Sequence, residues 1–430
     1  MASKRHGLRK ALQARFMLAA EAVCNRPTDA AAVAALRSLP CDPTGCPSPA
    51  QGADAFDIDA GVMGQALLEI GHFAEAQQWY ERAVAQAKHA NMHGLVDHGT
   101  LWSSLHQVGV CLSSLGRFVE AQKWHQRAIT AAEHDDVHGR ANPAMLGRSF
   151  HEMGFCSSSL GQFAEAQTWY ERAIAAAENG DVQSGADHVT LASGFHHIGF
   201  CLSSRGQFAA ARTWYERAVA AAEYGDVHGR VDQSSRGRSL HEMGFCLSSM
   251  GQFTEGQTWF ERAIVASEHG DVHGRVDHTM LGRSLHEMGF CLSSLGTFAE
   301  AQMWYERAVA EAEHGDVHGR VDHTSLGRSL HELGVCLWSL GQVADAQTWF
   351  ERAVAEKEQG DVHGRVDHAS LGSSLHQVGC CLWTLGPVAD AQKWYERAVA
   401  EKEQGDVHGR RDHESLALSR AAFSDRHAQL

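Results

Sequence analysis

The sequence predicts an all-α protein, a solenoid of tandem helix–turn–helix repeats. Three observations lead to this prediction. The sequence is self-similar at a fixed interval, it holds 42 glycines but only seven prolines, and its apolar residues recur at helical spacing. Two short amphipathic helices cannot bury their apolar faces alone, so neighbouring repeats are expected to stack into one continuous core.

The interval is 45 residues, and it is kept without insertion or deletion from Gly71 to His413. A tryptophan column marks it, with an arginine three residues after each member. The tryptophans are Trp79, Trp124, Trp169, Trp214, Trp259, Trp304, Trp349 and Trp394. These columns predict eight repeats.

One repeat, residues 324–368, shows the construction. A first helix is predicted by apolar residues at helical spacing, which are Leu326, Leu330, Leu333 and Leu337. Gly341 then permits a tight turn. A second helix is predicted by Val343, Ala346, Phe350 and Ala353. Gly360 ends it, as a residue with positive φ does at a helix C-terminus, and Asp367 is a candidate N-cap of the next helix.

This pattern of small and aromatic residues resembles the tetratricopeptide repeat. It runs Leu333-Gly334, Leu337, Gly341, Val343, Ala346, Phe350, Ala353. The longer period resembles the kinesin-light-chain-like subtype, whose linker reads G-x-x-H-P-x-V-A. Here the linker at residues 315–322 reads Gly-Asp-Val-His-Gly-Arg-Val-Asp, with glycine in place of proline. The resemblance implies a right-handed α-α superhelix whose first helices line a concave groove.

Three parts of the chain are expected. Residues 1–56 form an N-terminal helical arm and linker, and residues 1–50 carry seven Lys and Arg against three Asp and Glu. Residues 57–413 hold the eight tandem repeats. Residues 414–430 form an unpaired helix, which either caps the last repeat or connects the chain to another copy.

Seven cysteines share the 45-residue period and lie between apolar neighbours. They are Cys111, Cys156, Cys201, Cys246, Cys291, Cys336 and Cys381. Equivalent atoms of stacked helix pairs lie about 10 Å apart, too far for a disulfide, which needs Cα atoms within about 7 Å. These cysteines are therefore expected to be reduced core residues of a cytoplasmic protein. No apolar run reaches the length of a membrane span, so no membrane association is expected.

The resemblance implies that a column of histidines faces the groove. It comprises His106, His151, His196, His241, His286, His331 and His376. Phenylalanines follow one turn later at Phe155, Phe200, Phe245 and Phe290, and the linkers carry Arg140, Arg230, Arg275, Arg320, Arg365 and Arg410. The asparagines with which relatives grip peptides are absent.

Two functions fit these residues. The first is a non-enzymatic scaffold that binds an extended protein partner in its groove and joins end to end with copies of itself into a filament. The alternative is a solenoid that binds single-stranded RNA, stacking bases on the aromatic residues and holding phosphates with the arginines. The net charge of −15 argues against the second.

Arginine and glutamate covary along the repeats. Arg148, Arg238, Arg283 and Arg328 each stand four residues before Glu152, Glu242, Glu287 and Glu332, and repeats that lack the arginine lack the glutamate too. One helical turn apart, such residues can form local ion pairs. The competing interpretation is a ladder of arginines for phosphates.

Catalysis, a metal and a cofactor are not expected. The chain has 29 histidines, but no repeat contributes a pair of cysteines of the zinc-finger kind, and histidines one repeat apart cannot share an ion. No phosphate-binding loop or nucleophile elbow occurs. The sequence therefore predicts a protein that is not an enzyme.

Overall fold

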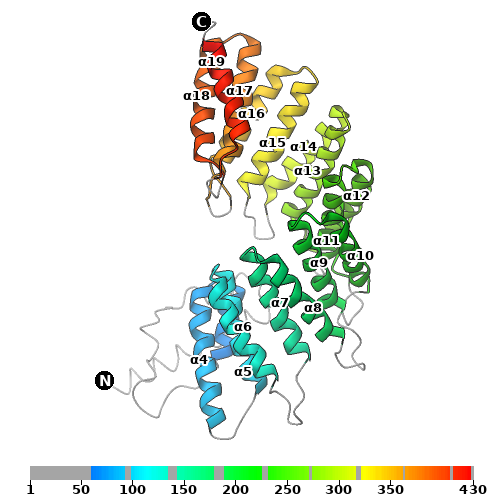
Figure 1. Ribbon diagram of the computed structural model, residues 1–430, viewed down its shortest axis with the longest axis vertical. Coiled ribbons are helices and arrows are strands. Elements are labelled where there is room, and N and C mark those ends of the chain that lie inside the picture. Colours follow the sequence, from blue (N-terminus) through cyan, green and yellow to red (C-terminus); the bar gives the residue numbers. More distant parts are fainter. Residues whose placement is uncertain are drawn as a thin grey trace, which may run out of the picture. The chain divides into compact units, whose positions relative to one another are not determined.

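The computed structural model describes residues 60–92, 98–133, 143–178, 188–224, 231–270, 274–315, 321–361, 364–406 and 410–427. Within these ranges the regular structure consists of seventeen α-helices and no strand (Figure 1). The prediction of an all-α repeat protein is thus confirmed. The arm predicted at residues 1–56 lies outside the described residues.

The chain divides into two compact units, residues 1–205 and 206–430. The helices of the N-terminal unit are α3 (Ala60–Glu69), α4 (Phe73–Met92), α5 (His98–Ser114), α6 (Phe118–Glu133), α7 (Pro143–Ser159), α8 (Phe163–Glu178) and α9 (His188–Ser204). Those of the C-terminal unit are α10 (Phe208–Ala222), α11 (Gln233–Ser249), α12 (Phe253–His269), α13 (His278–Ser294), α14 (Phe298–His314), α15 (His323–Ser339), α16 (Val343–Lys357), α17 (His368–Leu385), α18 (Val388–Gln404) and α19 (His413–His427).

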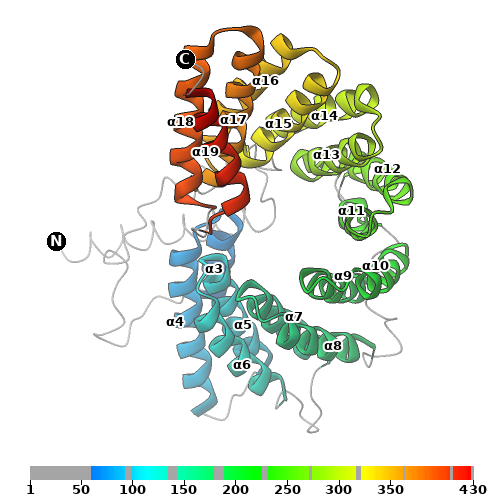
Figure 2. The same cartoon turned by 45° about the horizontal axis from the view of Figure 1, so that its top comes forward.

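Within each unit every helix packs against the next one along the chain. Odd-numbered helices are the first helices of repeats, and even-numbered helices are the second. In the C-terminal unit the first helices α11, α13 and α15 also contact one another in succession. They lie on the inner side of the arc that this unit forms (Figure 2).

Glycine and aspartate set the helix ends, as the sequence predicted. Gly341 has a φ of 78° in the turn between α15 and α16, and Gly360 has a φ of 83° after α16. Asp322 caps α15 by accepting hydrogen bonds from the backbone N–H groups of Thr324 and Ser325. Asp367 caps α17 in the same way through Ser370.

The two helices of a repeat meet at a glycine that lies against an aromatic ring. A Cβ atom added at Gly154 of α7 would lie 2.7 Å from a ring carbon of Tyr170 in α8, and one at Gly334 of α15 equally close to Phe350 in α16. Both rings are fully buried. The same contact recurs at Gly64 with Tyr80, Gly244 with Phe260, Gly289 with Tyr305 and Gly379 with Tyr395. Any larger residue at these glycines must push the helices apart.

Two glycines of α7 allow this constraint to be tested within one helix. We expect Gly154→Ala to lower the free energy of unfolding by about 1–3 kcal/mol, the usual cost of overpacking. Gly147→Ala should instead raise it by up to about 1 kcal/mol, because a Cβ there meets only atoms at ordinary distances of 3.6 and 3.7 Å. Urea unfolding of the two variants measures both effects. Equal effects would contradict the role of the ring.

Candidate interaction surface

The exposed sides of the first helices α7, α11, α13 and α15 each carry a set of three side chains. In α13 these are Arg283, Glu287 and Phe290, at spacing i, i+4 and i+7, which places them on one face. Arg283 is exposed, Glu287 is half-buried and Phe290 is 40% exposed. We call this series the first-helix strip. It recurs in α7 and α11, and α15 carries Val335 in place of the phenylalanine.

Each phenylalanine of the strip is held in place by a second ring. Phe290 packs edge to face against Phe253, the first residue of α12, with ring centroids 6.1 Å apart. The same arrangement joins Phe118 to Phe155, Phe163 to Phe200, and Phe208 to Phe245. The exposed rings are therefore positioned by the preceding repeat and leave part of their surface open to a ligand.

The histidine column lies deeper than the phenylalanines. His241 and His286 are only 3% and 5% exposed, while the other five histidines of the column are half-buried. The expectation that the column faces the groove therefore does not hold for His241 and His286. Both lie inside the stack, and each side chain also makes a hydrogen bond to the following repeat.

That hydrogen bond joins His241, His286 and His331 each to a serine 43 residues later. The Nδ1 atom of His241 lies 3.0 Å from the Oγ atom of Ser284, and the His286–Ser329 and His331–Ser374 pairs have the same distance. These serines share the 45-residue period, but the sequence analysis did not single them out. The pairs form a polar link between successive first helices.

Burial keeps these histidines neutral. It lowers the pKa of His241 to about 3, assisted by the positive charges of Arg283 and Arg328, and it holds the pKa of His286 well below its usual value. Burial also raises the pKa of Glu242 and of Glu287, against the effect of nearby arginines. The strip thus rests on a layer of polar groups that is largely shielded from water.

The local arginine–glutamate pair predicted within a first helix is not formed by Arg283 and Glu287. Among the described residues no hydrogen bond or ion pair joins these two side chains. The arginine that acts most strongly on Glu287 is Arg328 of the next repeat, followed by Arg283. Arg283 of α13, the next first helix along the chain, likewise lowers the pKa of Glu242. The covariation of arginine and glutamate therefore reflects interactions between neighbouring repeats as much as interactions across one helical turn.

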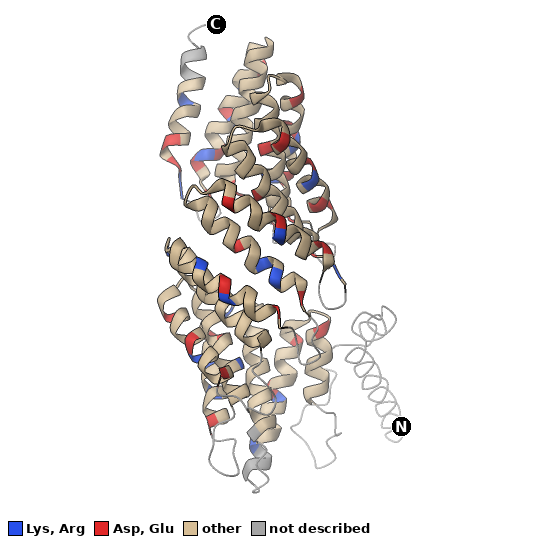
Figure 3. Cartoon of the chain, turned by 90° about the vertical axis from the view of Figure 1, so that its right-hand side faces the viewer, with Lys and Arg blue, Asp and Glu red and all other residues tan. Residues whose placement is uncertain are grey.

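Acidic and basic residues are interspersed along the helices of each unit (Figure 3). The linker arginines follow this pattern. Arg365 and Arg410 form ion pairs with Asp361 and Asp406, with nitrogen–oxygen distances of 2.6 and 2.7 Å, and Arg275 is exposed. Arg140, Arg230 and Arg320 lie outside the described residues. Arg365 and Arg410 thus have acidic partners, so these linker arginines do not form a purely basic track.

One repeat of the N-terminal unit departs from the others. His125 takes the place that Tyr170 fills in the next repeat; it is fully buried, and neither ring nitrogen has a hydrogen-bond partner. Burial lowers its pKa to about 4, and the same holds for His106, whose ring lies 5.4 Å away. His125 was not predicted from the sequence, although a histidine in a column of tyrosine and phenylalanine is a visible signal.

The tryptophan and arginine columns that define the period belong to the second helices. Arg262 lies over the ring of Trp259 at 4.3 Å, and six further Arg–Trp pairs stack in the same way. Arg307 also forms an ion pair with Glu268 of the preceding repeat at 3.2 Å. These columns therefore stabilise the stack, and the first helices remain the candidate surface.

Comparison with known proteins agrees with the geometry. A family model described as tetratricopeptide repeat matches residues 145–223 and 280–359. None of the curated proteins matches the sequence.

Two solved structures with TM-scores above 0.5 share the fold. The apo form of RapI superposes with a TM-score of 0.56 at 10% identity, covering 91% of this chain and 98% of that one. The apo form of the quorum sensor NprR from B. thuringiensis gives 0.54 at 10% identity, covering 80% and 88%. A putative kinesin light chain from Podosopora anserina, with nearly identical TPR-like repeats, is 24% identical over 50% of this chain and 97% of its own, with a TM-score of 0.37.

The neutral histidines predict that stability falls on acidification. The unfolded chain binds a proton at His241 near the ordinary pKa of 6.5, whereas the folded protein binds it only near pH 3. Between these values the unfolded state holds more protons, so this stability is complete above pH 6.5 and is lost as the pH falls. One such histidine contributes a slope of up to about 1.4 kcal/mol per pH unit.

We expect His241→Gln to reduce that slope, because glutamine can still bond Ser284 but does not titrate. Urea unfolding between about pH 7 and pH 5 measures it. His269→Gln is the control. Because His269 is exposed, this substitution should leave the slope unchanged. The raised pKa values of Glu242 and Glu287 change stability with pH in the opposite direction. Both glutamates are present in wild type and variant alike, so the difference between the two slopes reports on His241. Equal slopes for wild type and His241→Gln would exclude the buried neutral state.

Proposed function

Because the chain is a tetratricopeptide repeat protein, we propose that it is a non-enzymatic scaffold that binds an extended protein segment along the first-helix strip. The observation that carries this proposal is the repetition of an exposed arginine, a half-buried glutamate and an exposed phenylalanine on the first helices α7, α11 and α13, with valine replacing the phenylalanine in α15. A series of equivalent contact sets suits a linear partner.

The spacing of the sets fits an extended chain. Neighbouring helices pack about 10 Å apart, and an extended peptide advances about 3.3 Å per residue. Each repeat would therefore meet about every third residue of the partner. Phe245 and Phe290 offer apolar surface for its side chains, while Arg283 and Glu287 offer a donor and an acceptor for its polar groups.

Charge favours a protein over a nucleic acid. Glu242, Glu287 and Glu332 alternate with Arg283 and Arg328 along the strip, and each carboxyl group senses an arginine of its own or the next repeat. A polyanion such as single-stranded RNA would meet these carboxylates wherever it met an arginine. Exposed phenylalanines and arginines are the features that RNA binding would use, so RNA is retained as an arm of the test.

The cysteines support a reducing, cytoplasmic setting for this scaffold. All eight cysteines among the described residues are free, and seven of them are buried. Burial raises the pKa of Cys111 and of Cys336 to about 12, so these thiols stay protonated and unreactive.

None of the described helices combines the length and the apolar character needed to cross a bilayer.

The C-terminal helix supports a second candidate function, end-to-end association with another copy. α19 packs on α18 as a further first helix would: Ser419 lies 3.2 Å from His376, which repeats the histidine–serine link, and Leu416 is buried. Leu418, in contrast, is 63% exposed. A contact of this end with the opposite end of a second copy is heterologous and would propagate into a ring or filament.

Peptide binding is tested with the substitution that the chain itself uses. We expect the double variant Phe245→Val, Phe290→Val to bind peptide at least about tenfold more weakly, as for loss of aromatic anchor residues. The fold should tolerate valine at both positions, because Val335 occupies the same position in α15. Linear peptides selected from a random display library on the wild type are the probes, measured by fluorescence anisotropy. Arg262→Gln, on the second-helix side, is the control and should bind normally.

Two results would contradict this proposal. One is equal affinity of the selected peptides for the double variant and the wild type. The other is failure to select any peptide while single-stranded homopolymer RNA binds with a steep dependence on salt, which would favour the alternative function.

End-to-end association predicts that Leu418→Glu abolishes large species. Sedimentation velocity of the intact protein should show concentration-dependent oligomers, and the variant should sediment as a monomer with unchanged melting temperature, because Leu418 is exposed in one copy. If α19 is only a cap, the intact protein sediments as a monomer at high concentration. Deleting residues 414–430 would then lower stability and promote aggregation, since the face of α18 that α19 covers becomes exposed and His376 loses its partner Ser419.

A further inference from the structure

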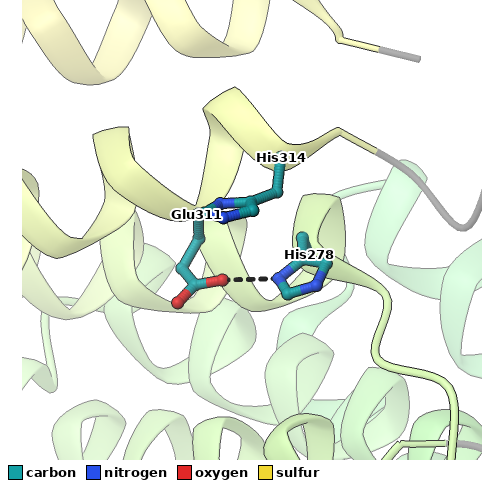
Figure 4. Close-up of side chains that lie close together, drawn as sticks. All are labelled: His278, Glu311 and His314. Atoms are coloured by element: carbon teal, nitrogen blue, oxygen red, sulfur yellow. Dashed lines mark hydrogen bonds and ion pairs between the residues drawn. The ribbon is translucent and has the colours of Figure 1, made fainter. Parts of the chain in front are cut away.

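Three side chains of metal-ligand type meet in one repeat of the C-terminal unit. His278 is the first residue of α13, and Glu311 and His314 lie in the last turn of α14 (Figure 4). One nitrogen or oxygen atom from each of them lies within 4.8 Å of the others. His278 and Glu311 are half-buried and His314 is exposed, so an ion can reach them from solvent.

Hydrogen bonds already orient both imidazole rings. The Nδ1 atom of His314 lies 2.8 Å from the carbonyl oxygen of Ala310, which can only accept. Nδ1 must therefore carry the proton, and in the neutral ring Nε2 keeps a lone pair for a metal. Such an outer hydrogen bond is the usual way in which proteins fix a histidine ligand. The His278 ring stacks on that of His314, with centroids 5.0 Å apart.

The third ligand distinguishes this repeat from its neighbours. His278 Nδ1 lies 2.7 Å from a carboxylate oxygen of Glu311, and the same pair recurs at the same distance between His323 and Glu356 and between His368 and Glu401. The pair by itself is thus a link between the two helices of a repeat. In those two repeats the position of His314 holds Gln359 or Gln404, which are poor metal ligands.

We propose that His278, Glu311 and His314 form a binding site for Zn²⁺ or a similar divalent transition ion. Two imidazoles and one carboxylate are a recurrent zinc ligand set, with bonds of about 2.0–2.2 Å. Tetrahedral ligand atoms at that distance from the ion stand about 3.4 Å apart. The three ligand atoms, now within 4.8 Å of one another, reach this spacing by rotation of the partly exposed side chains. Three protein ligands leave one coordination position open, which water or a side chain of a partner fills.

The sequence predicted no metal site, because neither one linker nor one column of the repeat brings three ligand side chains together. His278 and His314 are 36 residues apart in the chain and belong to different columns of the repeat. The antiparallel packing of α13 on α14 brings the start of one helix to the end of the other. The site therefore follows from the fold of a single repeat and needs no contact between repeats.

The chain offers both a loss and a gain variant for the test. His314→Gln copies the residue of the next two repeats, and Gln359→His recreates the full set with His323 and Glu356. Untagged full-length protein is titrated with ZnCl₂ by calorimetry and with CoCl₂ by visible absorbance. Because the other histidines contribute a common background, the differences between the variants report on this site.

We expect His314→Gln to lose one equivalent of Zn²⁺, or to weaken it at least about tenfold, together with the Co²⁺ absorbance bands. Gln359→His should gain one equivalent. Circular dichroism should be unchanged in both, because each residue already occurs at that position in a folded repeat. Equal stoichiometry and affinity in wild type and His314→Gln would overturn the proposal, and so would a Gln359→His variant that binds no additional ion.

Discussion

The close approach of a first-helix glycine to an aromatic ring of the second helix is the contact on which each repeat depends. With a Cβ atom excluded at Gly289, the α13 backbone lies against the Tyr305 ring, and this distance fixes how the two helices cross. The buried leucine and cysteine of the same helix, such as Leu285 and Cys291, can then reach the neighbouring repeat. The exposed face, with Phe290, is positioned by the same contact.

The buried histidines of the C-terminal unit enter the stack with a partner supplied at the repeat interval. His286 is buried without charge, and Ser329 of the next repeat satisfies it. The glutamates beside these histidines stay half-buried, and arginines of the same and the next repeat offset their charge. At His125, which replaces the tyrosine or phenylalanine of its column without any change of the interval, both ring nitrogens are left without a partner in the core. A buried polar group is thus stabilised where the neighbouring repeat supplies its partner.

The sequence was sufficient for the fold because every repeat reports on the same structure. The helices, the turn at Gly341 and the caps at Asp322 and Asp367 all follow from local spacing. The burial of His241 and the cross-repeat influence of Arg328 on Glu287 could not be predicted, since a column gives a position within a repeat but not the angle between repeats. His278 and His314 were missed for a related reason: only antiparallel packing joins the two ends of a repeat.

The uniform histidine–serine joint has a consequence for how the array can change in length. His241, His286 and His331 present the same atom to the same kind of partner at three successive junctions, so a block of 45 residues added or deleted there leaves matching groups on both sides of the cut. A block of any other length would shift the register of the histidine and serine columns relative to each other. Recombination within such a gene therefore yields folded proteins only in whole-repeat steps, which makes array length a trait that can vary while the joints stay intact.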